Sequence, residues 1–356
     1  MLYRERYNKL GLFYTWRCTG ACAHCVANSS PKRREKIDFA LARDIVRDAI
    51  SLGFKVLSFT GGESLLYERE VLALARMASR EGGMSVLVMT NGFWARSERQ
   101  ADAFARQLAD SGVSHVCIST DKHHVEAGLP FDSVWNGVRA ARAHGLKVKC
   151  QYARMKADRE LEEFTQIAEA EKVRFDVAGT QPFGRGASFD RALLPSDDQV
   201  EDALCPVNPN ILPSLQVIQC CDGSLLTERA PPSHPVVLGD LSEESLEEII
   251  LGARRGEDAL LTAFNVWGPK KLGRLLGSDF WKCAEEPPFY STCDLCCRLL
   301  CDPERVNELR QIVADPRMKL KIQRHAQIME TLDSKRSDLD PEWEVDVPED
   351  TVNSRR

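Results

Sequence analysis

The chain has 356 residues and a formal net charge of −6, because 53 acidic side chains outnumber 47 lysines and arginines. This length allows one large domain, or a large and a small one, each with a buried core. The acidic balance argues against a nucleic-acid partner, and no apolar run approaches the roughly 18 residues of a membrane helix or forms a secretory signal. We therefore expect a cytoplasmic protein that binds neither nucleic acid nor membrane.

From about residue 11 to 186, short β-rich runs alternate with longer helical ones. The predicted strands are 12–16, 55–60, 85–90, 114–119, 147–151 and 174–179. The predicted helices are 39–52, 68–80, 97–111, 131–144 and 159–170. Strands that alternate with helices in this way predict an α/β fold with a parallel sheet and right-handed crossovers.

Three cysteines, Cys18, Cys22 and Cys25, follow the first predicted strand. Three thiolates can hold three corners of a four-iron cluster and leave the fourth iron open for a ligand that is not protein. Taken alone, the Cys-x3-Cys-x2-Cys spacing also suits a zinc site, because His24 lies within the run.

The second predicted strand ends in Phe59-Thr60-Gly61-Gly62-Glu63. The cysteine run followed by this Gly-Gly-Glu turn resembles the radical S-adenosylmethionine (SAM) enzymes. The resemblance implies a partial (β/α)6 barrel and a [4Fe-4S] cluster with an open site that SAM chelates. It also implies a reductase partner such as flavodoxin or ferredoxin, and places Gly61, Gly62 and Glu63 at the methionine end of SAM, where glycine permits close approach.

Polar residues also follow the third and fourth predicted strands. Ligands in parallel barrels bind at the carboxyl ends of the strands, so Asn91, Ser119 and Asp121 are candidate SAM contacts. Turn and helix-cap roles are the alternative for these residue types. His123 and His124, which come next, are expected to be polar surface residues. Arg185, in a Gly/Pro-rich turn after the sixth strand, either faces a carboxylate of SAM or substrate or is exposed.

A second module begins near residue 191, where the alternation stops and eight cysteines follow. Cys205, Cys220, Cys293 and Cys296 resemble the ligands of the "twitch" extension of radical SAM enzymes, which implies one auxiliary [4Fe-4S] cluster. The longer SPASM extension would hold a second auxiliary cluster, with Cys283, Cys297 and Cys301 as the available ligands. Cys117 and Cys150 are expected to be buried core residues.

The adjacent pair Cys220-Cys221 leaves one thiol over, because neighbouring side chains of an extended segment point to opposite faces. The pair belongs to a wider resemblance to the radical SAM peptide epimerases of the YydG kind, which convert L-residues of a ribosomal peptide to D-residues. It rests on 17–25 with Ser29-Ser30-Pro31, on 59–63, on 91–94, on Ile118-Ser119 with Asp121 and His124, on Cys205-Pro206, and on 289–293 with Cys296. The resemblance implies that Cys221 donates a hydrogen atom to a substrate radical and that Cys220 is a cluster ligand.

Other functions remain open at this point. Pro213-Ser214-Leu215-Gln216 replaces the Asp-Gly hairpin that precedes the cysteine pair in those epimerases. A twitch-type dehydrogenase of a small molecule, such as an aminocyclitol or sugar, needs no thiol donor, and a structural or electron-transfer protein needs no substrate. The predicted organisation is a radical SAM partial barrel over 1–190, an auxiliary-cluster domain over 191–302, a helical cap over 303–332 and a disordered acidic tail over 333–356.

Overall fold

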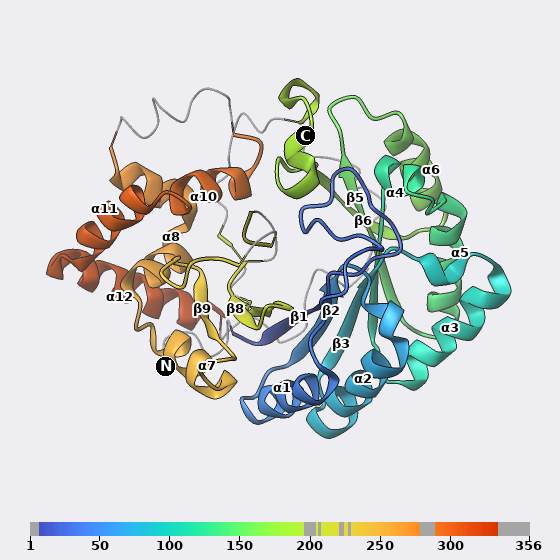
Figure 1. Cartoon of the computed structure of the whole chain (residues 1–356), viewed down its shortest axis with the longest axis horizontal. Helices are drawn as coiled ribbons and strands as arrows, with labels where there is room; N and C mark the ends of the chain where they lie inside the picture. Colours follow the sequence, from blue (N-terminus) through green and yellow to red (C-terminus); the bar gives the residue numbers. More distant parts are fainter. Residues whose placement is uncertain are drawn as a thin grey trace.

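The computed structural model of the chain describes residues 7–195, 204–205, 208–220, 224–226, 229–277 and 289–333. Its first half is an open parallel sheet flanked by helices (Figure 1). The strands are β1 (Lys9–Thr15), β2 (Val56–Gly61), β3 (Ser85–Thr90), β4 (His115–Thr120), β5 (Lys147–Arg154) and β6 (Arg174–Gly179). The helices are α1 (Phe39–Ser51), α2 (Glu68–Gly82), α3 (Glu98–Asp110), α4 (Lys122–Glu126), α5 (Phe131–Ala143) and α6 (Glu160–Ala170). This arrangement confirms the predicted α/β fold.

The six strands pair in chain order, each parallel to the next. The residues of β1 are almost all buried, whereas those of β5 and β6 are more polar and partly exposed. The predicted strands and helices agree with the observed ones to within three residues at either end. The short helix α4, directly after β4, was not predicted, since five residues are too few to show a helical period.

Each helix turns one apolar face towards the sheet, and the side chains of these faces form the core together with those of the strands. Phe164 on α6 stacks against Trp135 at a ring-centroid distance of 5.2 Å and lies tilted against Tyr152 at 5.1 Å. Such aromatic contacts add to the area that each ring buries. The helices thereby hold the carboxyl ends of the strands in a fixed arrangement.

The sheet continues beyond β1 into the second half of the chain. Strand β7 (Asn210–Ile211) pairs parallel with β1, and β8 (Gln216–Ile218) and β9 (Val237–Asp240) follow antiparallel. Gly11 of β1 leaves no room for a Cβ atom, because the side-chain amide of Asn210 lies where that atom would be. The two halves of the chain therefore share one nine-stranded sheet.

Five helices complete the described part of the second half: α7 (Leu246–Arg255), α8 (Ala259–Leu275), α10 (Thr292–Leu300), α11 (Pro303–Ala314) and α12 (Pro316–Asp333). Helix α8 is kinked at Gly268, which precedes Pro269, and packs against α10, α11 and α12 around a second core. The cap predicted over 303–332 is two helices, because Pro316 starts a new helix that Asp315 caps through the amides of Arg317 and Met318. The predicted acidic tail lies, apart from Asp333, outside the described residues.

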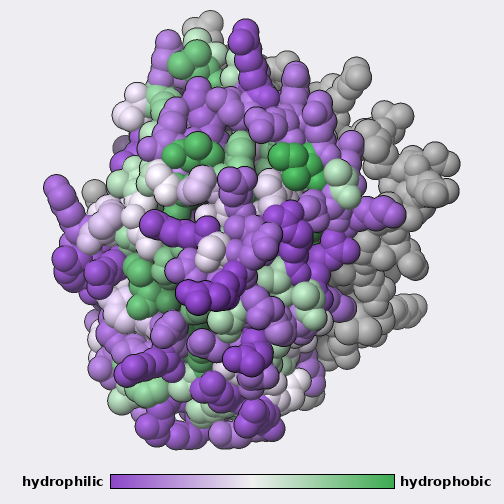
Figure 2. Space-filling view, turned by 90° about the vertical axis from the view of Figure 1, so that its right-hand side faces the viewer, coloured by the Kyte–Doolittle hydropathy of each residue, from purple (hydrophilic) through white to green (hydrophobic). Residues whose placement is uncertain are grey.

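The face of the molecule on the α5 and α6 side is mainly hydrophilic, with scattered apolar side chains (Figure 2). Among the described residues, no helix combines the length and the apolar character that crossing a lipid bilayer requires.

Candidate active site

A cavity of about 470 Å³ lies at the carboxyl ends of the parallel strands. Residues from the ends of β2 to β6 line it, together with the loop after β1 and with Asn208, Asn210 and Leu226 from the second half of the chain. The predicted residues that line this cavity are Cys18, Cys22, Cys25, Gly61, Gly62, Asn91, Ser119 and Asp121. Because parallel strands end at one edge of the sheet, residues up to 103 positions apart along the chain meet here.

The cysteine loop is held from both sides by backbone hydrogen bonds. The amide of Cys18 donates to the carbonyl of Ser30 at 3.1 Å, and the amide of Cys25 donates to the carbonyl of Cys22 at 3.1 Å. On the other side, Arg185 donates from Nε to the Cys22 carbonyl at 2.8 Å and from Nη2 to the Ser29 carbonyl at 2.7 Å. Arg185 is therefore neither a free surface residue nor turned to a ligand carboxylate; it clamps the loop.

The three thiols of this loop are not in disulfides, and they share one cavity. Burial, followed by the charge of Glu63, raises the pKa of Cys18 to about 11. Burial, followed by the charge of Asp121, raises the pKa of Cys22 to about 12. Thiols in this state bind metal only by giving up their protons, as a thiolate-bound cluster requires. Three thiols in one cavity, that of Cys22 buried and those of Cys18 and Cys25 partly buried, fit a four-iron cluster with three protein ligands.

The Gly61-Gly62 turn packs directly on the cysteine loop. Gly61 has a φ of +119°, and a Cβ atom on Gly62 would collide with the backbone of Arg17, at 2.7 Å from its carbonyl carbon. The Gly62 amide donates to the Thr15 carbonyl at 2.7 Å, and the Glu63 amide donates to the Arg17 carbonyl at 2.8 Å. Glycine is needed at both positions because backbone meets backbone here.

Glu63 is completely buried and is not among the residues that line the cavity. Its carboxylate accepts hydrogen bonds from the Thr90 hydroxyl at 2.9 Å, the Asn91 amide at 2.8 Å and the Leu65 amide at 3.1 Å. Burial raises the pKa of Glu63 to about 7, although these hydrogen bonds act in the opposite direction. The side chain thus joins the end of β2 to the end of β3 and sets the position of Asn91.

Asn91 reaches the cysteine loop with its side chain. Its Nδ2 atom donates to the Thr19 hydroxyl at 3.0 Å and lies 3.5 Å from Cys18 Sγ, while its Oδ1 atom accepts from the Phe93 amide at 3.2 Å. A hydrogen bond to a thiolate ligand is one of the means by which a protein tunes an iron–sulfur cluster.

Asp121 is buried after β4 and contacts two histidines. Its Oδ2 atom lies 3.2 Å from His24 Nε2 and 2.8 Å from His124 Nδ1. Burial acts to raise the pKa of Asp121, but the charge of His124, followed by the charge of His24 and the hydrogen bond from the His124 backbone amide, lowers it to about 2. Burial lowers the pKa of His24 to about 4. His24, which sequence reasoning considered as a zinc ligand beside the cysteines, therefore has a carboxylate partner.

The prediction that His123 and His124 are surface residues is wrong. The ring of His123 is buried and stacks between His24 and Phe189, at centroid distances of 5.2 and 5.1 Å. His124 lines the cavity. The available sequence signal was an aspartate after a buried strand with a histidine three residues later, which places both on one turn of a helix.

The cysteines of the second half lie near the second core. Cys205, Cys220 and Cys296 pack against it, and Cys293, Cys296 and Cys297 share helix α10. Burial, followed by the charges of Cys205 and Cys301, raises the pKa of Cys296, so both thiols are near enough to act on it electrostatically. Cys221 and Cys283 lie outside the described residues. Cys117 and Cys150 are buried in β4 and β5, as predicted.

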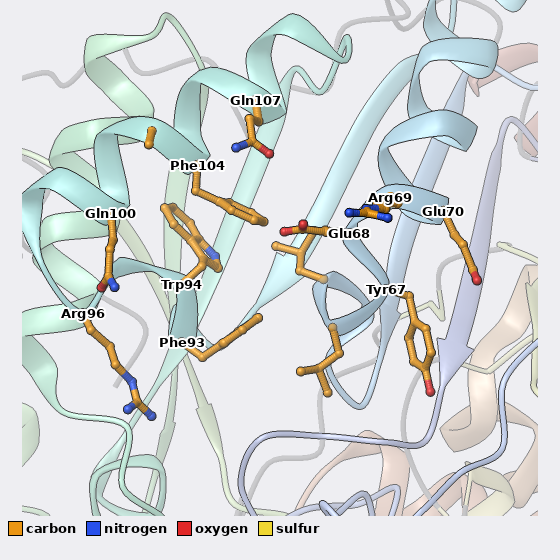
Figure 3. A pocket seen from close by; sticks show the side chains of 13 residues that line it. Tyr67, Glu68, Arg69, Glu70, Phe93, Trp94, Arg96, Gln100, Phe104 and Gln107 are labelled. Carbon is orange, nitrogen blue, oxygen red and sulfur yellow. The ribbon is translucent and has the colours of Figure 1, made fainter.

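A larger cavity of about 700 Å³ lies between the starts of α2 and α3 (Figure 3). Phe93, Trp94 and Phe104 line one side and residues 67–70 the other. It contains none of the predicted site residues and no cysteine or histidine. The smaller cavity is therefore the candidate active site.

Comparison with known proteins bears on the family of the first half of the chain. Residues 13–168, which include the cysteine loop, match the family model described as the radical SAM superfamily. This part of the chain is a radical SAM domain. The radical SAM family implies a [4Fe-4S] cluster and SAM, and Cys18, Cys22 and Cys25 are the thiols available for the cluster.

Two curated relatives differ in what their names describe. Over 208 residues the chain is 26% identical to the GTP 3′,8-cyclase of Moorella thermoacetica, covering 55% of this chain and 62% of that protein. Over 123 residues the chain is 27% identical to the putative peptide biosynthesis protein YydG of Bacillus subtilis, covering 33% of this chain and 37% of that protein. The chain thus spans less than two thirds of either relative.

A solved structure shares the fold. SuiB of Streptococcus suis, in its complex with the precursor peptide SuiA, superposes with a TM-score of 0.50 and 16% identity, covering 68% of this chain and 64% of that chain. The superposition extends beyond the 156 residues of the matched domain, so it includes part of the second half.

Proposed function

We propose that the protein is a radical SAM enzyme that modifies a ribosomal peptide by converting an L-residue to a D-residue, with Cys221 as the hydrogen donor. One observation carries the radical SAM assignment: the three thiols of the cysteine loop face the same 470 Å³ cavity as the Gly61-Gly62 turn and Asn91. The peptide substrate and the inversion of configuration are proposed in addition to this assignment.

Cys18, Cys22 and Cys25 would hold the cluster, and Gly61, Gly62, Asn91, Ser119 and Asp121 would surround SAM. When bound and reduced, this pair of cofactors supplies a 5′-deoxyadenosyl radical that abstracts a hydrogen atom from the substrate. The chain itself contributes the orientation of the loop through Arg185, and the close backbone approach at Gly62.

The position of Cys220 supports the role of Cys221. Asn210, which lines the cavity, donates from Nδ2 to the carbonyl of Cys220 at 3.1 Å. Cys220 is thereby held by a residue of the cavity wall. A thiol donor that met the substrate radical on the face opposite the one that lost its hydrogen atom would invert the configuration of that carbon.

Cys205, Cys220, Cys293 and Cys296 would bind one auxiliary [4Fe-4S] cluster. The proximity of Cys205 and Cys296 supports this set. A cluster with four thiolate ligands has no open iron, so it would not bind SAM. After Cys221 gives up a hydrogen atom, its thiyl radical would need one electron, passed from the reductase through this cluster, and one proton from solvent to become a thiol again. A reductase such as flavodoxin or ferredoxin would reduce the SAM-binding cluster.

Two of the similar proteins favour a peptide substrate, since one is named for peptide biosynthesis and the other is described with a precursor peptide. The relatives named GTP 3′,8-cyclase favour a second candidate, in which the cavity takes a small molecule and no thiol donor is used. The two candidates differ in their dependence on Cys221.

The deciding experiment uses anaerobically reconstituted enzyme, dithionite, SAM and synthetic copies of short peptides encoded beside the gene, in deuterated water. Wild-type enzyme is expected to release 5′-deoxyadenosine and to place one solvent deuterium on the inverted Cα. Cys221→Ala is expected to release 5′-deoxyadenosine but to give no inverted product, whereas Cys117→Ala, in a strand core, is the matched control. Inverted, deuterated product from Cys221→Ala would rule out the thiol donor, and a lack of 5′-deoxyadenosine from loaded wild-type enzyme would rule out the radical mechanism.

A further inference from the structure

Three potential metal ligands converge beside the cysteine loop: His24 Nε2, Asp121 Oδ2 and His124 Nδ1. These side chains come from the loop after β1, the end of β4 and helix α4. The ligand atoms all lie within 4.8 Å of one another. No step of the proposed radical mechanism needs two histidines at this place.

The two oxygens of Asp121 have separate roles. Oδ1 accepts the backbone amide of His124 at 3.0 Å and so caps α4. Oδ2 faces both imidazole rings, at 3.2 Å from His24 and 2.8 Å from His124. One oxygen is thus sufficient for the helix cap, and the second is left to the histidines.

The contact between Asp121 and His124 is close but is not a hydrogen bond. His124 Nδ1 is buried and has no hydrogen-bond partner among the described residues, although Asp121 Oδ2 is 2.8 Å away. A nitrogen and an oxygen that bind one cation at adjacent positions, each about 2.1 Å from it, lie about 3 Å apart without pointing at each other. The two distances around Asp121 Oδ2 have this spacing.

The surroundings favour a preformed site with open coordination positions. His24, Asp121 and His124 all line the 470 Å³ cavity, so a bound cation would face it. The His24 ring is held from behind by His123, which in turn stacks on Phe189. Arg185 holds the backbone on either side of His24 through the carbonyls of Cys22 and Ser29. Two imidazoles and one carboxylate with open positions suit divalent manganese, iron or zinc.

We propose that His24, Asp121 and His124 bind one divalent cation, separate from the iron–sulfur clusters, whose open positions face the cavity. Such an ion would bind oxygen atoms of a ligand in the cavity and would balance the buried charge of Asp121. The ligand class that fits an ion of this kind is a hydroxyl- or carboxylate-bearing molecule.

The test uses the cluster-reconstituted protein after dialysis against a chelator, with Mn²⁺ as the probe because it has little affinity for thiols. Loss of the EPR signal of free Mn²⁺ during a titration counts the bound ions, and pulsed EPR of bound Mn²⁺ detects its nitrogen ligands. Wild-type protein is expected to bind one Mn²⁺ with two imidazole nitrogens. His124→Ala is expected to weaken binding by at least about tenfold and to leave one nitrogen.

His144→Ala is the matched control, because His144 also contacts an aspartate, Asp102 at 2.8 Å, but lies on the outer surface. It should bind Mn²⁺ like the wild type. Asp121→Asn is a second variant in case His124→Ala loses iron or folds poorly, and it should bind at least about tenfold more weakly. Wild-type protein without stoichiometric Mn²⁺, or variants with unchanged affinity, would overturn the proposal. Release of 5′-deoxyadenosine, measured without added Mn²⁺, reports on the proposed function separately.

Discussion

Arg185 donates a hydrogen bond from its Nε atom to the carbonyl oxygen of Cys22, a residue 163 positions earlier in the chain. The same guanidinium also binds the carbonyl of Ser29, and the Arg185 amide binds the carbonyl of Cys25. The turn after the last barrel strand thereby closes over the loop after the first. The cluster-binding loop is stabilised by the whole barrel and not by its own residues alone.

Replacing Arg185 should therefore loosen the loop. Arg185→Met removes two charged hydrogen bonds to partly buried carbonyls, which should lower the free energy of unfolding by about 2–4 kcal/mol. The variant should also hold less iron after reconstitution and lose it faster in air. Arg185→Lys keeps the charge but not the planar guanidinium, so its stability and iron content should lie between those of the wild type and Arg185→Met. Iron analysis and urea denaturation measure both effects, and full iron content with unchanged stability in Arg185→Met would contradict the clamp.

Gly62 should not tolerate a side chain. In Gly62→Ala the new methyl group would overlap with the Arg17 backbone, so the turn must move, at a cost of about 1–3 kcal/mol. Since the turn lines the cavity, SAM affinity measured by calorimetry should fall as well. Gly252→Ala, within helix α7, is the control and should stabilise the protein by about 0.5–1 kcal/mol. Wild-type stability and SAM affinity in Gly62→Ala would disprove the close packing.

Glu63 should make stability fall with rising pH. Its pKa is raised from 4.5 to about 7 in the folded protein, so the folded state binds more protons than the unfolded state between these values. Stability from this group is therefore present below pH 4.5 and is lost as the pH rises through about 7. Urea denaturation from pH 5 to 8 should show a steeper decrease for the wild type than for Glu63→Gln. Parallel curves would contradict the raised pKa.

Arg254 should be a main link between the second half and the barrel. It is 4% exposed and donates to the carbonyls of Tyr7 and Leu52 at 2.8 Å each. Arg254→Met leaves both carbonyls without this donor and should lower the free energy of unfolding by about 3 kcal/mol. Its neighbour Arg255 forms an exposed pair with Glu257, so Arg255→Met should change stability by less than about 0.5 kcal/mol. Equal effects of the two substitutions in thermal denaturation would refute the link.

Iron content should separate the two groups of cysteines. Two four-iron clusters predict about eight irons per chain, and Cys296→Ala should reduce this to about four. Cys117→Ala should leave it unchanged, because Cys117 is buried in β4 away from the cavity lining. About twelve irons in the wild type would mean that Cys283, Cys297 and Cys301 bind a further cluster, and about four would mean that no auxiliary cluster forms.

The amino-acid sequence by itself determined the strand–helix units and the positions of the cysteine loop and the Gly61-Gly62 turn. These features depend on local pattern: apolar periodicity, glycine where backbone meets backbone, and thiols at metal-ligand spacing. A parallel sheet then brings the strand ends to one edge, so the grouping of Cys18, Asn91 and Asp121 follows from the fold class.

Only the tertiary structure decided which groups contact one another across the site. The clamp by Arg185, the burial of His123 and the convergence of His24 and His124 on Asp121 join segments far apart in the chain. The continuation of the sheet from β1 into β7, at Gly11 and Asn210, is of the same kind. No local pattern encodes these contacts, because they depend on the paths of several loops packed together, and each loop is stabilised mainly by its neighbours in space.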